Sequence, residues 1–171
     1  IHFSKEWENT VREEADAKPF LIAFFNIFGV NQRRVATFEH KVKKINDTDG
    51  YIDMLWKGTL LVEMKSRGKN LDKAYQQAKD YILGLNQYEI PKYIMICDFD
   101  IFHLYDLDSG EKIEFHLSEL IDYIEYFGFI AGYQKKEYKE QDKVNIDAAE
   151  LMGKLHDRLK EIGYVGHSLE V

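Results

Sequence analysis

The sequence of 171 residues contains a single cysteine and no apolar run long enough to cross a membrane. One thiol excludes an internal disulfide and is typical of a protein of the reducing cytoplasm. Residues 1–30 lack the basic start and small-residue cleavage site of a signal peptide, because Glu and Asp interrupt them. Cys97 lies in the apolar run YIMIC, which favours a buried, inert thiol over a nucleophile. We therefore expect a cytoplasmic protein that does not associate with a membrane.

Basic residues are fewer than acidic ones, 23 Lys/Arg against 30 Asp/Glu, and the formal net charge of −7 argues weakly against nucleic acid as a partner. The distribution is uneven, because residues 31–79 hold 11 Lys/Arg against 6 Asp/Glu, a net of +5 that leaves −12 for the rest. A basic segment with a few inward-facing carboxylates is compatible with phosphate binding once a metal neutralises them. The alternative is a solvated charged face.

Hydrophobic residues at 45% and aromatic residues at 14% predict a folded globular domain. At the N-terminus, Ser4 is a candidate cap for a helix with apolar residues at helical spacing as far as Ala15. Pro19 suits the first turn of a second, buried helix that Gly29 can end.

The middle of the chain predicts strands around one helix. The expected elements are a strand or short helical end at 35–42, a loop at 45–50, strands at 51–56 and 59–66, a basic loop ending in the cap Asn70, a helix at 71–84, strands at 92–99, 101–107 and 112–117, and a helix from Ser118 to about Ile124. This order predicts an α/β fold with a mixed central sheet flanked by helices.

The C-terminal part has a different composition. Residues 133–146 are polar and predict a linker, and from Asp147 a helix presents Leu151, Leu155 and Leu159 on one face. We expect one domain over residues 1–132, a linker at 133–146 and a further helical segment at 147–171. That last helix either packs on the core or begins a following domain.

Three charged residues stand where burial disfavours them. Asp53 lies in the first apolar strand of the predicted hairpin, and Glu63 and Lys65 lie at the end of the second. Carboxylate oxygens are the ligands that Mg²⁺ prefers, and a lysine beside them could orient or deprotonate a water and stabilise negative charge. Asp53, Glu63 and Lys65 therefore predict a metal-dependent site that hydrolyses phosphodiesters.

The acid-x-Lys tripeptide alone is weak evidence, because the chain contains four of them. Only the tripeptide from Glu63 to Lys65 ends an apolar strand and follows a strand that carries an acid. The alternative is an ion pair between these two residues on a solvated sheet face.

The geometry of the turn decides whether the two acids meet. A two-residue turn that pairs Trp56 with Thr59 would place Asp53 opposite Val62 and on the wrong face from Glu63. A three-residue loop at 57–59, or a bulge, would place Asp53 opposite Glu63. We predict the second arrangement.

The helix that follows adds a row of polar residues beside its apolar stripe. Lys73, Gln77 and Tyr81 are spaced four apart and share one side of the helix. Gln77 and Tyr81 could support the lysine or hold a phosphate. A row that simply faces solvent is the alternative.

These residues resemble two linked nuclease motifs. Asp53 followed by Glu63-Met-Lys65 resembles the PD-(D/E)XK motif, with Ile52 in place of the proline, and Gln77-Ala-Lys-Asp-Tyr81 resembles the QxxxY motif of RecB-type nucleases. Glu39 matches in position an acid that some members add from the preceding element. The resemblance implies that Asp53 and Glu63 bind metal, and that Glu39 is a further acid that could hold a second metal or a metal-bound water. Lys65 activates water, and Gln77 and Tyr81 support the site.

A closer resemblance covers most of the chain. Its segments are 33–45, 50–82, 91–107 and 148–171, which are similar to the N-terminal region of MmeI-like fused restriction–modification enzymes. In that family a nuclease domain precedes a helical spacer, an adenine methyltransferase and a target-recognition domain, and the enzymes serve in phage defence. By resemblance the helix from Asp147 begins the spacer. The chain contains neither an Asn-Pro-Pro-Tyr/Phe sequence nor a glycine-rich cofactor loop. We therefore expect it not to methylate DNA or recognise a specific DNA sequence by itself, and S-adenosylmethionine to bind only a methyltransferase part outside it.

The resemblance implies the nuclease domain of a type II restriction endonuclease. We expect it to cleave double-stranded DNA with Mg²⁺, for which Mn²⁺ can substitute, and two copies to meet transiently when both strands are cut. Arg67, Lys69 and Lys73 are candidate phosphate contacts. The alternatives are a PD-(D/E)XK nuclease of a repair type and a catalytically idle DNA-binding or interaction module.

Overall fold

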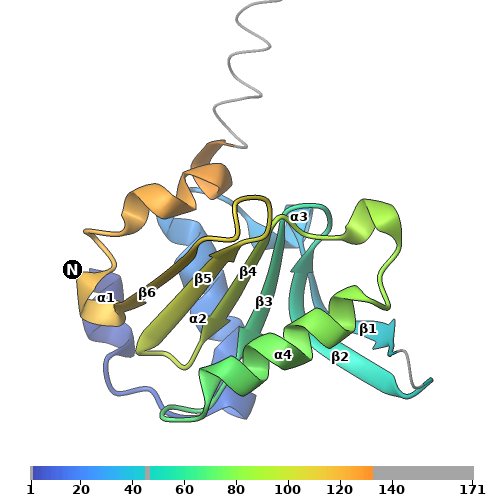
Figure 1. The fold of residues 1–171 in the computed structure, drawn as a ribbon. Coiled ribbons are helices and arrows are strands. Elements are labelled where there is room, and N and C mark those ends of the chain that lie inside the picture. Colours follow the sequence, from blue (N-terminus) through green and yellow to red (C-terminus); the bar gives the residue numbers. More distant parts are fainter. Residues whose placement is uncertain (1, 45–46, 133–171) are drawn as a thin grey trace, which may run out of the picture. The chain divides into compact units, whose positions relative to one another are not determined.

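Six strands form one mixed sheet in the order β1-β2-β3-β4-β5-β6, in a computed structural model that describes residues 2–44 and 47–132 (Figure 1). The strands are β1 (Thr37–Lys43), β2 (Asp49–Trp56), β3 (Leu60–Met64), β4 (Tyr93–Cys97), β5 (Ile101–Asp106) and β6 (Lys112–His116). Neighbouring strands are antiparallel except β3 and β4, which are parallel because a helix connects them. The predicted mixed sheet is confirmed.

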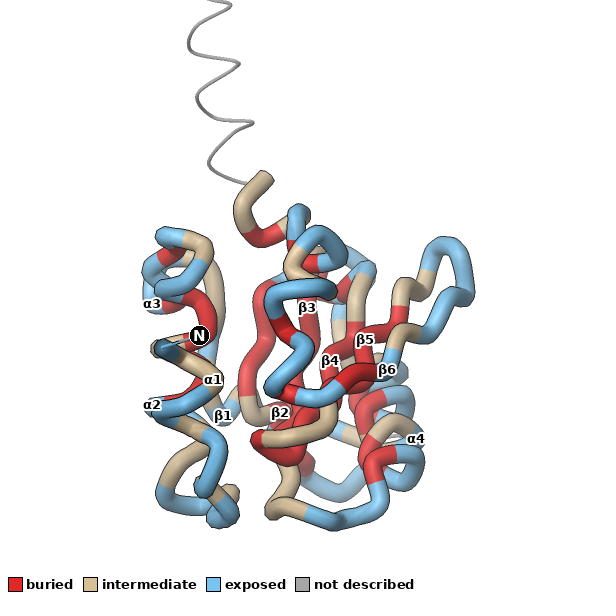
Figure 2. Tube along the Cα trace, turned by 90° about the vertical axis from the view of Figure 1, so that its left-hand side faces the viewer, coloured by how far each residue is buried: buried red, intermediate tan, exposed pale blue. Residues whose placement is uncertain are grey.

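Helices cover both faces of this sheet, with α2 on one side and α4 on the other (Figure 2). The helices are α1 (His2–Trp7), α2 (Glu13–Ile27), α3 (Gln32–Val35) and α4 (Leu71–Ile82), with short 3₁₀ turns η1 (Gln87–Glu89), η2 (Leu117–Glu119) and η3 (Ile124–Phe127). A hydrophobic core lies on each face of the sheet. Side chains of β3 alternate between the two cores, since Leu60 and Val62 pack with α2 whereas Leu61 packs with α4. None of the helices in the described ranges is long and apolar enough to cross a membrane.

The N-terminal helices begin and end elsewhere than predicted. The first helix ends at Trp7 instead of continuing to Ala15, and Ser4 does not cap it but donates its hydroxyl to the Leu117 carbonyl at 3.0 Å. The second helix begins at Glu13, so that Pro19 lies inside it. Gly29 follows the end of α2 with a left-handed φ of 69°, as predicted.

Packing explains why a helix tolerates this proline. Four aromatic and aliphatic side chains that follow Pro19 are fully buried, namely Phe20, Leu21, Phe24 and Phe25. Acidic residues in the first turn of α2 favour the helix start through the helix dipole. Tertiary burial therefore outweighs the hydrogen bond that the proline removes.

The predicted helix from Ser118 to Ile124 is wrong. The chain there forms the separate turns η2 and η3. Leu117, Leu120 and Phe127 are each at most 4% exposed and insert into the aromatic core at different points, which favours turns over one continuous helix. The predicted linker at 133–146 and the helix from Asp147 lie outside the described residues.

Helix α4 follows directly on the loop after β3, and Asn70 caps it as predicted. The Asn70 side-chain oxygen accepts a hydrogen bond from the Lys73 amide at 2.9 Å. We expect Asn70→Ala to lower the free energy of unfolding by about 1 kcal/mol, because a capped amide loses its acceptor. Urea unfolding measures the change, with Asn70→Asp as a control that retains the acceptor. Equal losses in both variants would contradict the capping role.

Candidate active site

A three-residue turn sets the register between β2 and β3. Trp56 pairs with Leu60 and Met54 pairs with Val62, so residues 57–59 form the loop. Gly58 has a left-handed φ of 70°, which a side chain disfavours. Continuing this register places Asp53 opposite Glu63, and the predicted arrangement of the turn is confirmed.

The ladder between these strands stops just before the acidic pair. Asp53 does not continue the ladder with its main chain; its Oδ2 accepts a hydrogen bond from the Met64 amide at 2.7 Å. Met54 belongs to the core under α2, whereas Ile52 belongs to the core under α4, so β2 changes face at Asp53. This irregularity turns the carboxylate toward the end of β3.

Strand β1 is irregular at the same level. Pairs between Phe38 and Met54 and between His40 and Ile52 flank Glu39, which therefore lies opposite Asp53. Glu39 adopts a left-handed φ of 51° in the middle of the strand. Such a conformation in a residue other than glycine is strained and is common at functional sites.

The strain at Glu39 leads to a stability prediction. Glu39→Gly is expected to raise the free energy of unfolding by about 1 kcal/mol, because glycine adopts this conformation without a Cβ clash. Glu39→Ala removes the same carboxylate and keeps the strain, so it is the control. Chemical unfolding of both variants measures the difference, and a glycine variant no more stable than the alanine variant would show that the backbone is not strained.

Glu63 and Lys65 extend from the end of β3. Glu63 is 1% exposed, and its Oε2 lies 3.2 Å from the Lys65 Nζ. Its other oxygen, Oε1, is buried without a hydrogen-bond partner. The Lys65 ammonium also lies 3.6 Å from Oε1 of Glu13, at the start of α2, and the other oxygen of Glu13 accepts from the Ser66 amide at 3.0 Å.

Burial makes these carboxylates difficult to ionise. Desolvation, and then the charge of Asp53, raise the pKa of Glu63 to about 8. Burial likewise raises the pKa of Asp53, against the opposing hydrogen bond from Met64. Burial lowers the pKa of the Lys65 ammonium, but the carboxylates around it, first that of Glu63, raise it further, so the net direction is upward. The carboxylates of Asp53, Glu63 and Glu13 around Lys65 therefore carry more negative charge, when ionised, than this one ammonium neutralises.

This donor set fits a hard divalent cation. Asp53 and Glu63 come from facing strands, and the unpartnered Oε1 of Glu63 has an unused site for a ligand. Within residues 2–44 and 47–132, however, no three His, Cys, Asp or Glu side chains are grouped closely enough to hold a metal ion. Glu39 is therefore not gathered with Asp53 and Glu63 into a three-carboxylate cluster, although its charge raises the pKa of Asp53. Its role as a metal ligand stays a prediction.

Gln77 and Tyr81 contact each other. The Gln77 amide donates to the Tyr81 hydroxyl at 2.5 Å, and Tyr81 is only 4% exposed. The Lys44 ammonium lies over the Tyr81 ring, 4.9 Å from its centre. In the described part of the chain, neither residue forms a hydrogen bond or ion pair with Asp53, Glu63 or Lys65. Their support of the site stays a prediction, and the burial of Tyr81 opposes a direct phosphate contact.

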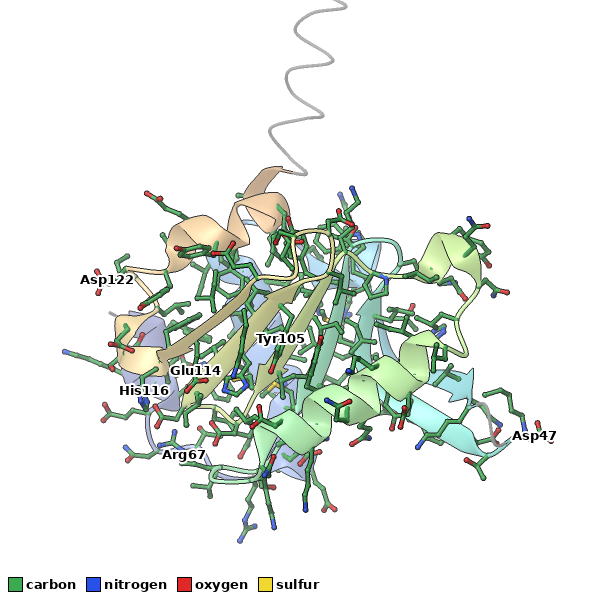
Figure 3. All side chains as sticks on the ribbon, viewed as in Figure 1. Asp47, Arg67, Tyr105, Glu114, His116 and Asp122 are labelled. Atoms are coloured by element: carbon green, nitrogen blue, oxygen red, sulfur yellow. The ribbon has the colours of Figure 1, made fainter. Side chains whose placement is uncertain are left out.

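The three predicted phosphate contacts differ in their surroundings. Arg67 turns back toward the segment that leads into α2 (Figure 3), where its Nε donates to the Thr10 carbonyl at 3.0 Å and its Nη2 is buried without a partner. Lys69 and Lys73 are exposed. Arg67 thus holds the loop after β3 against the segment before α2, and the exposed Lys69 and Lys73 are the more accessible candidates for a phosphate contact.

Glu13 is the site residue that the sequence pattern did not reveal. It lies far from the motif along the chain, and only its position at the start of an acidic helix turn distinguishes it. The packing of α2 under the sheet brings it to Lys65.

Similarity to known proteins is found at three levels. The family model described as "MmeI, N-terminal domain" matches residues 1–162. A Bacillus subtilis (strain 168) protein named "DNA methyltransferase A" is 20% identical over 148 residues, which cover 85% of this chain and 16% of that protein. The solved structure described as "cryoEM structure DrdV-DNA complex" is similar with a TM-score of 0.44 and 18% identity, over 68% of this chain and 12% of that one. The chain thus spans a small part of the length of both relatives.

Proposed function

This chain belongs to the family of MmeI N-terminal domains, a module of restriction–modification enzymes, and from that premise we propose that it is a Mg²⁺-dependent DNA endonuclease domain of the PD-(D/E)XK type. One observation carries the proposal. Asp53 lies opposite a buried Glu63 that has an unpartnered oxygen and a lysine ammonium 3.2 Å from the other one. Two such carboxylates beside a cation are suited to metal-assisted hydrolysis of a phosphodiester.

Asp53 and Glu63 would hold the Mg²⁺, for which Mn²⁺ can substitute, and a main-chain carbonyl near Met64 is a further oxygen donor. When bound, the metal polarises the phosphate and lowers the pKa of a water. Ionisation of Glu63 and Asp53 becomes favourable beside a dication, which offsets the burial that raises their pKa values.

Lys65 supplies positive charge to the reaction. Its raised pKa keeps the ammonium protonated at neutral pH, so it is suited to orienting the attacking water and stabilising charge on the phosphate. Deprotonation of this water is the second role that the sequence leaves open for Lys65. Glu13 and Glu63 hold this ammonium from two sides and limit its freedom.

Double-stranded DNA is the proposed substrate, and the exposed Lys69 and Lys73 are the proposed contacts to its backbone. We infer that methylation, S-adenosylmethionine binding and target recognition belong to other domains of the same polypeptide, in agreement with the small share of its relatives that this chain covers. Two copies that meet transiently would cut both strands.

Supercoiled plasmid cleavage tests the proposal. Nicked and linear DNA should form with Mg²⁺ or Mn²⁺, and EDTA should abolish both products. DNA binding without cleavage under any metal condition would indicate an interaction module. A strong preference for branched over plain duplex DNA would indicate a repair-type nuclease.

A further inference from the structure

Asp98 is a buried carboxylate at the end of β4, outside the motif residues. It is 1% exposed, and its Oδ1 accepts hydrogen bonds from the amides of Asp100 at 3.1 Å and Ile101 at 2.7 Å. These two bonds close the turn that starts β5. A turn of this kind requires only one carboxylate oxygen.

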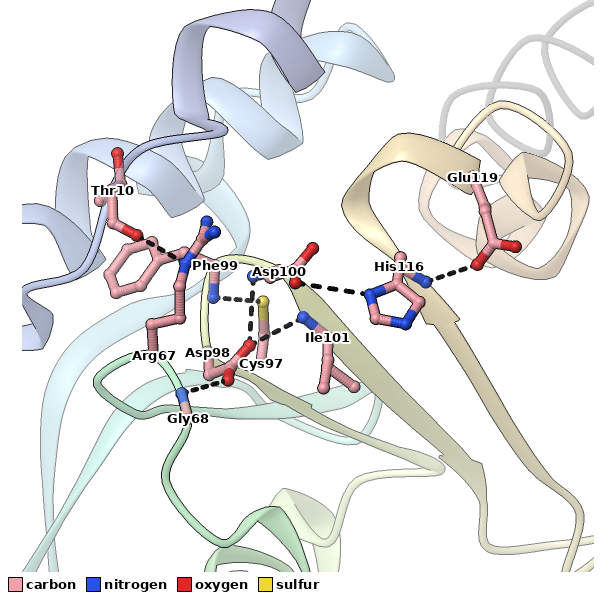
Figure 4. A network of polar contacts seen from close by, with 10 residues as sticks. All are labelled: Thr10, Arg67, Gly68, Cys97, Asp98, Phe99, Asp100, Ile101, His116 and Glu119. Atoms are coloured by element: carbon pink, nitrogen blue, oxygen red, sulfur yellow. Dashed lines mark hydrogen bonds and ion pairs between the residues drawn. The ribbon is translucent and has the colours of Figure 1, made fainter.

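The second oxygen of Asp98 bonds to a different segment. Its Oδ2 accepts from the Gly68 amide at 2.8 Å, across 30 residues of sequence (Figure 4). Gly68 lies in the loop that directly follows Lys65 and has a left-handed φ of 79°. Asp98 therefore joins the β4–β5 turn to the loop that begins at the proposed catalytic lysine.

Each backbone amide from Lys65 to Lys69 donates a hydrogen bond. The donors and acceptors are Lys65 to the Cys97 carbonyl at 2.8 Å, Ser66 to Glu13 at 3.0 Å, Arg67 to the Val11 carbonyl at 3.3 Å, Gly68 to Asp98 at 2.8 Å, and Lys69 to the Ser66 carbonyl at 3.1 Å. Three separate parts of the fold thus fix the main chain from which the Lys65 side chain extends. Two of these acceptors outside the loop are side chains, those of Glu13 and Asp98, and the others are main-chain carbonyls.

The turn that carries Asp98 is itself strained. Phe99 has a left-handed φ of 73°, and its ring is fully buried 5.2 Å from the ring of Phe20. Its amide lies 3.3 Å from the Cys97 sulfur. A buried aromatic residue in this conformation persists only when its surroundings fix it. The hydrogen bonds of the Asp98 carboxylate to the amides of Gly68, Asp100 and Ile101 fix the turn that contains Phe99.

We propose that Asp98 is a positioning residue for DNA cleavage, because its Oδ2 fixes the loop after Lys65 and so holds the ammonium beside Glu63. The inference rests on the proposed function. A purely structural turn cap is the alternative, and the chain contains one for comparison. Asp106 Oδ1 accepts from the amides of Asp108 at 2.9 Å and Ser109 at 3.1 Å. In the described ranges the Asp106 carboxylate accepts no hydrogen bond from outside its own turn.

Asp98→Asn and Asp106→Asn form a matched pair. Asparagine keeps one oxygen for the two turn bonds, but at position 98 its amide nitrogen then faces the Gly68 amide, so donor meets donor. The measurements are kcat and KM for plasmid cleavage with Mg²⁺, together with amide hydrogen exchange of residues 66–69.

Asp98→Asn should lower kcat by about 10- to 100-fold, with KM within about twofold of wild type, because a displaced catalytic group loses alignment. Exchange at Gly68 should accelerate in the same variant. Asp106→Asn should leave kcat and the exchange of residues 66–69 unchanged. Gly68→Ala is the second variant, since a Cβ there meets nothing within 4 Å and only the positive φ opposes it; it should also lower kcat selectively.

Equal kcat values for the two asparagine variants in a protein that cleaves DNA would overturn the positioning role and leave the proposed function intact. Faster exchange at Gly68 without a loss of kcat would also overturn it. Absence of cleavage by the wild type would refute the proposed function, and the positioning role with it. If Asp98→Asn fails to fold, an unaltered kcat in Gly68→Ala overturns the inference.

Discussion

Lys65→Ala is expected to reduce the rate of plasmid cleavage by about 10²- to 10³-fold, the loss typical when one group that stabilises transition-state charge is removed. The ammonium lies 3.2 Å from Glu63 and is protonated at neutral pH, so no other side chain of the cluster replaces its charge. Single-turnover cleavage at saturating DNA and Mg²⁺ measures the chemical step.

Lys92→Ala is the matched control for this substitution. Lys92 is exposed just before β4, beside the beginning of β3 and at the opposite end of that strand from Lys65. Its backbone amide bonds to the Thr59 carbonyl, and alanine retains that bond. The control should cleave at the wild-type rate. Cleavage by Lys65→Ala within about threefold of wild type, well inside the loss expected for a charge-stabilising group, would remove Lys65 from the chemistry.

Glu63→Gln is expected to stabilise the metal-free protein while abolishing its cleavage. The pKa of Glu63 rises from 4.5 to about 8 in the folded state, so the folded protein binds more protons than the unfolded chain between these values. Stability of the metal-free wild type should therefore fall as pH rises from about 4.5 to about 8. Glutamine removes this dependence, and the shift corresponds to a gain in the free energy of unfolding on the order of 4 kcal/mol at pH 8.

Urea unfolding in EDTA at several values between pH 5 and about 8 measures the effect. Glu111→Gln, at an exposed carboxylate in the β5–β6 turn, is the control and should follow the wild-type curve. Mg²⁺ should stabilise the wild type and Glu111→Gln but not Glu63→Gln, because binding to the folded state alone adds stability. A glutamine variant that is no more stable than wild type at pH 8 would contradict the account of a destabilising buried acid.

The part of the site that could be predicted from the sequence follows from local rules. The register of the β2–β3 turn depends only on its length, so the spacing of the residues is enough to place Asp53 opposite Glu63. The cap at Asn70 has an equally local cause. Both features involve residues close in sequence, for which spacing carries the information.

The residues that escaped prediction depend on contacts between distant segments. Glu13 reaches Lys65 only because α2 packs under the sheet, and Asp98 reaches Gly68 only because β4 lies beside β3. The sequence predicts the start of α2 too late, because Pro19 suits the first turn of a helix. The helix continues through Pro19, since the burial of four following side chains outweighs the backbone hydrogen bond that the proline removes. Tyr81 shares the expected helix row with Gln77, yet it is buried because its ring packs against Gly50 of β2.

The most direct test of the central claim is to locate the metal. Crystals of the protein with Mn²⁺ should show an anomalous peak between the carboxylates of Asp53 and Glu63, about 2.1 Å from an oxygen of each. Asp53→Asn should remove the peak, and duplex DNA should place a phosphate beside it and Lys65. Mn²⁺ bound away from both carboxylates, in a protein that cleaves DNA with that metal, would contradict the account.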